Sequence, residues 1–297
     1  MFTLRLGLTL LIAALAAALI APLVAPAIAA AGLHFPFPRI FDRVVMATLA
    51  IAIWIESREL KLVRRLRAGF AHPWTSLPAA GYGLAAGAAA MAVLWGLAWF
   101  AAPIHAPTQP APVIMTLAAN LVPAVIIAVI EEGFFRAFLL DGIADDFGTG
   151  TALIASSAVY AAAHLVRSPA RFEVAALHPM AGLQTLAASL SQLADPRVAA
   201  PGLIGLFLLG LVLGKAFAAT GRVYFSIGLH ASLIMGAKTF RKLAPAAQSA
   251  PGWLSGWGRQ PLISGAAAWV ITIVLLIIVR RLTRSGDGST QDRPSLR

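Results

Sequence analysis

The chain has 297 residues, of which 59% are hydrophobic and 12% charged, with a formal net charge of +11. Soluble domains use about 45–50% apolar and about 25% charged residues, so this composition excludes an ordinary soluble protein. The basic residues lie at the ends of apolar stretches, where they orient membrane proteins, so the charge does not indicate a nucleic-acid partner. The absence of cysteine excludes disulfides, thiolate nucleophiles and cysteine-ligated zinc.

Eight apolar stretches are long enough to cross a bilayer, which takes about 17–25 residues in a helix. We expect these spans at residues 4–31, 41–57, 80–103, 113–140, 149–166, 201–219, 223–240 and 262–282. The predicted fold is therefore all-α, a polytopic transmembrane bundle of about eight helices. The first stretch ends in APAIAAAG, which is similar to a signal-peptide cleavage site, but its apolar run is longer than a typical signal core. We expect residues 1–31 to be retained.

By content, the chain divides into residues 1–112 with three N-terminal spans, 113–240 with the intramembrane ionisable residues, and 241–297 with the last span and a polar tail. The distribution of Lys and Arg favours both termini in the cytoplasm, and we expect a multi-pass protein of the plasma membrane. The connection between the fifth and sixth spans contains AGLQTLAASLSQLA, which predicts a short amphipathic segment at the interface.

Ionisable residues occur near the middle of only three predicted spans: Glu131, Glu132 and Arg136 within EEGFFR, then His164, then His230. Such groups are unfavourable in lipid and normally face the interior of a bundle, where they mark functional sites. Glu132 and Arg136 are i and i+4 neighbours, so we expect an ion pair within the helix. Glu131 lies well around the helix from Arg136 and is left to act as a general acid or base.

A purely structural interpretation also exists, because two glutamates and an arginine can join helices, and a lone intramembrane histidine commonly serves in packing. Two histidines on separate helices, together with Glu131, favour a functional site. The set Glu131, His164 and His230 could also supply three zinc ligands, although the chain has no HExxH helix.

Three motifs occur in order along these helices. EEGFFR fits the pattern EExxxR, YAAAH from Tyr160 to His164 fits a second pattern that is usually FxxxH, and SIGLHAS around His230 fits a third that is usually HxxxN. In these motifs the chain resembles the CAAX prenyl protease and bacteriocin-processing (CPBP or Abi) family of intramembrane proteases. The resemblance covers residues 115–240, so that 113–240 would form the protease core.

The resemblance implies an intramembrane endopeptidase that cuts a membrane-embedded or interfacial peptide or protein. Glu131 would be the catalytic glutamate that activates water, with His164 assisting, while Glu132 and Arg136 support it and His230 stabilises the oxyanion. The family's later assignment as glutamic proteases implies no cofactor, and the zinc alternative stays open. Eukaryotic members trim prenylated CAAX proteins, whereas others process bacteriocins or act in protein sorting, and the sequence does not choose among these substrates.

Two positions depart from the family patterns. Tyr160 replaces the usual Phe and keeps an aromatic ring one turn before His164. Ile234 stands where the third motif usually has Asn, so one oxyanion donor is missing, and losing such a donor typically lowers the rate by about 10²–10³-fold.

Two other polar residues are candidates to replace this donor. Ser226 lies one turn before His230 on the same helical face, although a hydroxyl bonded to its own helix backbone is an alternative interpretation. Asn120 is the only asparagine, but it precedes Glu131 by eleven residues, or about 16 Å along a helix, which is too far.

Two other classes of function are compatible with intramembrane Glu and His residues. A proton-coupled transporter uses such groups as a relay, but it commonly has paired halves, and the chain shows no internal repeat. A catalytically silent family member that binds a membrane partner would be consistent with Ile234.

Overall fold

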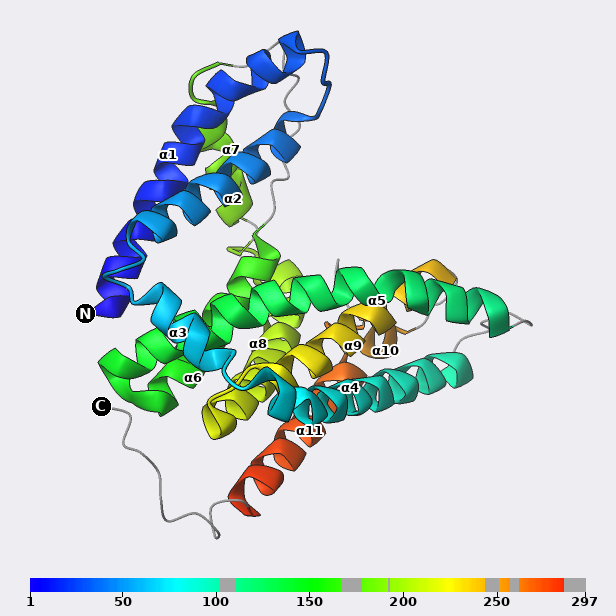
Figure 1. Cartoon of the computed structure of the whole chain (residues 1–297). Coiled ribbons are helices and arrows are strands. Elements are labelled where there is room, and N and C mark those ends of the chain that lie inside the picture. Colours follow the sequence, from blue (N-terminus) through cyan, green and yellow to red (C-terminus); the bar gives the residue numbers. More distant parts are fainter. Residues whose placement is uncertain (102–109, 167–177, 192, 244–250, 257–261, 286–297) are drawn as a thin grey trace. The chain divides into compact units, whose positions relative to one another are not determined.

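The computed structural model describes residues 1–101, 110–166, 178–191, 193–243, 251–256 and 262–285 (Figure 1). Every regular element within these ranges is a helix, as the composition predicts. The chain forms two compact units, Met1–Arg64 with Ala162–Ala199, and Arg65–Ala161 with Ala200–Arg297. The predicted division into 1–112, 113–240 and 241–297 follows motif content rather than compactness, and it stays a prediction.

The first unit is built on α1 (Phe2–Ala30), α2 (Phe37–Ile55) and α7 (Ala181–Ser191), with α1 packed against both of the others. Small residues allow α1 and α7 to approach each other closely. Gly182 of α7 lies against Ala18 of α1, and a Cβ added at Gly182 would overlap the carbonyl oxygen of Ala18. The segment predicted to be a short amphipathic helix is therefore α7, and it packs on α1. A buried hydrophobic cluster in this unit consists of Ala18, Ala21, Ala25, Phe37, Ile40, Phe41 and Ala181.

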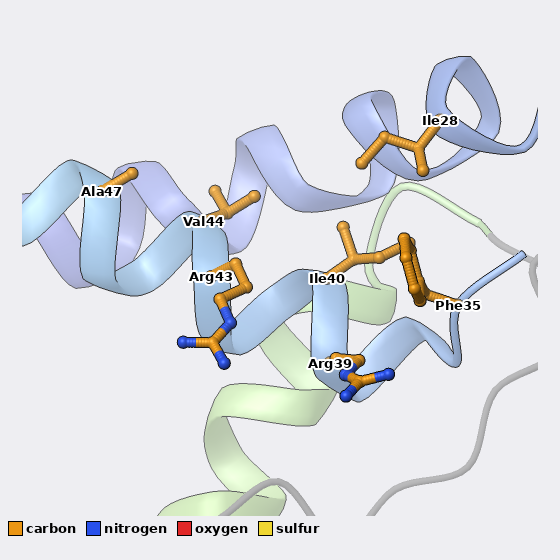
Figure 2. A pocket seen from close by; sticks show the side chains of 7 residues that line it. All are labelled: Ile28, Phe35, Arg39, Ile40, Arg43, Val44 and Ala47. Carbon is orange, nitrogen blue, oxygen red and sulfur yellow. The ribbon is translucent and has the colours of Figure 1, made fainter. Parts of the chain in front are cut away.

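A cavity of about 510 Å³ lies beside the connection between α1 and α2 (Figure 2). Arg39 and Arg43 line it one turn apart on α2, and the Arg39 guanidinium lies 5.5 Å from the ring centre of Phe35. Both arginines are exposed, which suits basic side chains that anchor a helix at a lipid–water interface. The remaining lining is apolar and consists of Ile28, Phe35, Ile40, Val44 and Ala47.

The second unit contains the site. Its elements are α4 (Pro73–Ala101), α5 (Pro110–Glu132), the π-helix η1 (Gly133–Leu140), α9 (Tyr224–Leu243), α10 (Gly252–Ser255), α11 (Ala266–Ser285), and most of α3 (Leu62–Gly69), α6 (Asp141–Leu165) and α8 (Pro196–Thr220). Helix α9 packs against both α4 and α5. It is therefore the central element of this unit.

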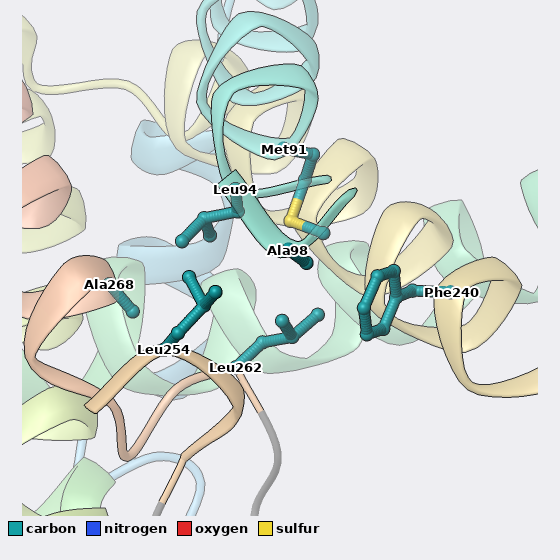
Figure 3. Close-up of a cluster of buried hydrophobic side chains, with 7 residues drawn as sticks. All are labelled: Met91, Leu94, Ala98, Phe240, Leu254, Leu262 and Ala268. Carbon is teal, nitrogen blue, oxygen red and sulfur yellow. The ribbon is translucent and has the colours of Figure 1, made fainter. Parts of the chain in front are cut away.

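A buried hydrophobic cluster joins the last helices of the unit to α4 and α9 (Figure 3). Apolar side chains from four helices converge in it, and this burial fixes the C-terminal half of α9 against α4. The cluster consists of Met91, Leu94, Ala98, Phe240, Leu254, Leu262 and Ala268.

Four helical stretches of the described chain are long and apolar enough to cross a membrane: Phe2–Ala30, Pro73–Ala98, Ala111–Leu165 and Ala199–Thr220. They identify a polytopic helical membrane protein. The third stretch has 55 residues, or about 80 Å of helix, against a hydrocarbon core of about 30 Å. Gly148 has a φ of 78° and breaks α6 between the predicted spans 113–140 and 149–166. Each of the eight predicted spans overlaps a helix, although residues 102–103 of the third lie outside the described residues and the last helix begins at Ala266. Their number in the bilayer stays a prediction.

Glycines bring the backbones of α4 and α9 into direct contact. A Cβ added at Gly83 of α4 would overlap the carbonyl oxygen of Phe225, and one at Gly228 of α9 would overlap the carbonyl oxygen of Ala80. Gly87, one turn beyond Gly83, is equally crowded by α9. Small residues at such crossings are the usual basis of helix association in membranes. The glycines thus determine how closely α9, which carries His230, approaches the rest of the unit.

We expect Gly83→Ala to destabilise the protein by about 1–3 kcal/mol, because the added methyl group overpacks a backbone contact. The check is the unfolding temperature of the purified protein in detergent. Gly96→Ala on the same helix is the matched control, since nothing lies within 4 Å of its added Cβ, and alanine favours helix over glycine. An unfolding temperature for Gly83→Ala equal to that of the wild type would contradict the tight crossing.

Candidate active site

The two acidic residues of EEGFFR end α5, and the rest of the motif begins the π-helix η1. Short π-helical segments are rare and occur frequently at functional sites. Glu132 and Arg136 are both fully buried, and Arg136 Nε donates a hydrogen bond to Glu132 Oε2 at 3.1 Å. The ion pair predicted from their i,i+4 spacing is confirmed.

Arg136 has a second support from an aromatic ring. Its guanidinium carbon lies 5.1 Å from the ring centre of Tyr160, an arrangement that gives a cation–π attraction. In the described part of the chain, Nη1 and Nη2 of Arg136 have no hydrogen-bond partner. The face of Tyr160 and the carboxylate of Glu132 therefore compensate the buried charge together.

His230 of α9 extends this ion pair across to a second helix. Its Nδ1 lies 2.9 Å from Glu132 Oε1, and the residue is 4% exposed. Because Glu132 is ion-paired with Arg136, its second oxygen acts as an acceptor and the Nδ1–H of His230 donates to it. One carboxylate thus binds the arginine through Oε2 and orients the imidazole through Oε1. The sequence predicts the ion pair but gives no sign of its link to His230.

The other ring nitrogen of His230 faces Glu131 and Tyr160. Nε2 lies 3.8 Å from Glu131 Oε2 and 3.4 Å from the Tyr160 hydroxyl oxygen. The side chain of Glu131 is 26% exposed, whereas that of Glu132 is fully buried. Glu131 therefore lies beside the imidazole of α9. It is the more exposed carboxylate of the two.

His164 belongs to the segment Ala162–Ala199 of the first unit. The structure does not place it relative to Glu131 and His230, so its part in the site stays a prediction. Of the three candidate zinc ligands, Glu131 and His230 are brought together. Across the described ranges, no group of three or more His, Asp or Glu side chains has an arrangement that could hold a metal ion.

The two candidate replacements for the missing donor are engaged elsewhere. Ser226 Oγ donates to the carbonyl oxygen of Leu213 in α8 at 3.0 Å, and the residue is fully buried. This bond crosses between helices, so it fits neither the expected donor role nor a bond to the serine's own helix. Asn120 Nδ2 donates to Thr239 Oγ1 at 3.2 Å and joins α5 to α9.

Residues 112–234 match the family model described as Rce1-like, type II CAAX prenyl endopeptidase. The predicted resemblance to this protease family is confirmed. The matched segment contains Glu131, Glu132, Arg136 and His230, and it ends at Ile234. The matched segment is therefore similar to a family of CAAX-type membrane proteases. The chain has no match among curated proteins or among solved structures.

Gly69 and Phe70 form a short segment outside the Rce1-like region, and this segment anchors two elements of that region. The carbonyl oxygen of Gly69 accepts a hydrogen bond from the backbone N–H of Val223 at 3.2 Å, and that of Phe70 accepts one from the Tyr224 hydroxyl at 2.8 Å. A Cβ added at Gly133 would lie 3.3 Å from the Phe70 ring. The segment thus holds the start of α9 and the start of η1 together. The sequence does not predict these contacts, because no motif or spacing signals them.

Arg65 is a second residue whose position the sequence did not reveal. It lies in a basic stretch that reads as an exposed connection, yet it is 3% exposed. It pairs with Asp141 and, at 2.6 Å, with Asp145 at the start of α6. The i,i+4 spacing of these two aspartates was the only available signal of a shared cation.

Proposed function

We propose that the chain is an intramembrane endopeptidase in which Glu131 activates the water that attacks a peptide carbonyl. The observation that supports this most is the carboxylate of Glu132, which links Arg136 to His230 and holds the imidazole next to Glu131. Glu131 is partly exposed while Glu132 is buried, so the reactants would meet Glu131.

In the proposed reaction, Glu131 accepts a proton from water while the water oxygen forms a bond to the carbonyl carbon. The carbonyl oxygen becomes an oxyanion, and His230, protonated on both nitrogens, donates to it from Nε2. Glu132 holds the Nδ1–H side of the ring, as a carboxylate orients the imidazole in hydrolase triads. The C–N bond then breaks, and the proton on Glu131 passes to the leaving amine with the assistance of His164.

For the substrate, we propose a protein or peptide that ends in a prenylated Cys-a-a-X motif. The name of the Rce1-like family model supports this class. Transfer of a prenyl chain from water into the bilayer is favourable by about 0.8 kcal/mol per buried CH₂. This transfer brings the substrate to the apolar surface of the protein. Helix α5 exposes Val122, Ile126 and Ile130 at four-residue spacing, and this stripe ends next to Glu131 in the sequence. The stripe offers an apolar path toward the site.

The test uses the purified full-length protein in liposomes. We expect it to release a fragment from a farnesylated peptide ending in Cys-a-a-X, detected by mass spectrometry, and to act more slowly on the same peptide without the farnesyl group. Equal rates on the two peptides would contradict the prenyl specificity and leave a protease of broader substrate class. Cleavage of neither peptide would contradict the proposed substrate.

A further inference from the structure

The hydroxyl group of Tyr160 has a contact that ring packing does not require. The residue is 1% exposed, its ring meets Phe135 edge-to-face at 5.0 Å, and its face supports Arg136. Phenylalanine would make the same ring contacts. The hydroxyl oxygen alone lies in the site, 3.4 Å from His230 Nε2. A buried tyrosine hydroxyl needs a polar partner, and here that partner is the catalytic imidazole.

Among the described residues, the other positions that the sequence suggests as donors are apolar or bonded elsewhere. Ile234, one turn after His230 on α9, has an apolar side chain and is partly buried. The hydroxyl of Ser226 donates to Leu213, and the amide of Asn120 donates to Thr239. Among the candidates that the sequence offers, Tyr160 is therefore the residue whose polar group meets His230.

We infer that the Tyr160 hydroxyl is the second oxyanion donor of this site, beside His230 Nε2. The inference rests on the proposed proteolytic function and deepens it. Two donor atoms 3.4 Å apart can both lie about 2.8 Å from one oxygen, which is the distance that an oxyanion hole requires. Before substrate binds, the hydroxyl oxygen accepts a hydrogen bond from the Nε2–H of His230. As negative charge develops on the carbonyl oxygen, the Nε2–H and the Tyr160 O–H both donate to it.

Both departures from the family motifs then have one explanation, because the donor lost at position 234 of α9 is replaced by the hydroxyl of Tyr160 of α6. In the resembling family, the second motif usually has Phe and the third usually has Asn, so the extra donor would come from the helix that corresponds to α9. Here Tyr160 of α6 has gained a hydroxyl and Ile234 of α9 has no polar group. The number of donors would be unchanged, although the helix that supplies one of them differs.

The experiment is a set of four variants, assayed on the farnesylated Cys-a-a-X peptide in liposomes. We expect Tyr160→Phe to lower kcat by about 10²-fold with little change in KM, because the lost bond forms only in the transition state. Adding Ile234→Asn to this variant should restore at least about 10-fold of the lost rate. Ile234→Asn alone and Tyr82→Phe, at an exposed tyrosine of α4, should retain the wild-type rate.

An unchanged kcat in Tyr160→Phe would overturn the inference, as would a loss that lies wholly in KM or that Ile234→Asn does not restore. Unfolding temperatures of all variants keep the result interpretable, since Phe preserves the ring contacts and Tyr160→Phe should unfold near the wild-type temperature. Failure of the proposed function has a different signature, which is a wild-type protein without cleavage or a Glu131→Gln variant with full activity.

Discussion

Glu131→Gln is expected to lower kcat for peptide cleavage by about 10²–10⁴-fold, because an amide cannot accept the proton of the attacking water. The side chain keeps its shape, it is partly exposed, and it lies at the open side of His230, so the unfolding temperature should stay near that of the wild type. The measurement is kcat on the farnesylated peptide in liposomes, with the unfolding temperature of the same preparation.

The matched control is Glu59→Gln, which changes an exposed glutamate that pairs with Arg5 in the first unit. It should retain the wild-type rate. The same assay is repeated with a chelator, and we expect no change in rate when Glu131 itself activates the water. Full activity in Glu131→Gln would contradict the mechanism, whereas a loss on chelation that zinc restores would replace the glutamic mechanism by a metal-dependent one.

Arg136→Met is expected to have the largest effect on stability, about 3–5 kcal/mol, because it leaves the buried carboxylate of Glu132 without its cation. Activity should fall with it, since Glu132 also orients His230. The measurements are the unfolding transition in detergent and the cleavage rate at a temperature where the variant is folded. Arg64→Met, which removes an exposed cation of α3, is the control for loss of charge.

The double variant Glu132→Met with Arg136→Met separates structural support from catalytic support. Removing both charges of a buried pair is often nearly neutral for stability, so the unfolding transition should move back toward that of the wild type. The cleavage rate should stay low, because Nδ1 of His230 has lost its acceptor. Recovery of both stability and rate would show that the pair acts only in packing.

The features of the protein that depend on the local spacing of residues can be predicted from the sequence. Apolar stretches of spanning length predict an all-helical membrane protein, and the four-residue interval predicts the ion pair of Glu132 with Arg136. The link from Glu132 to His230 depends on how α5 and α9 cross. That crossing is determined by single glycines such as Gly83 and Gly228, which carry no periodic signal of their own.

The contacts of the candidate donor side chains also could not be predicted from the sequence. Sequence reasoning treats Tyr160 as an aromatic replacement and Ser226 as a candidate donor, because the helical face is all that a single sequence gives. In the structure, the serine hydroxyl donates to a carbonyl oxygen of α8 and the tyrosine hydroxyl meets His230. Both contacts join residues far apart in the chain, and only packing reveals them.

In the proposed mechanism, Glu131 makes this membrane protein a peptidase. The most direct test compares the membrane proteomes of cells that carry the wild-type chain with those of cells that carry Glu131→Ala. The account predicts at least one new peptide terminus that is present with the wild type and missing with the variant. Identical sets of termini in the two membranes would contradict it.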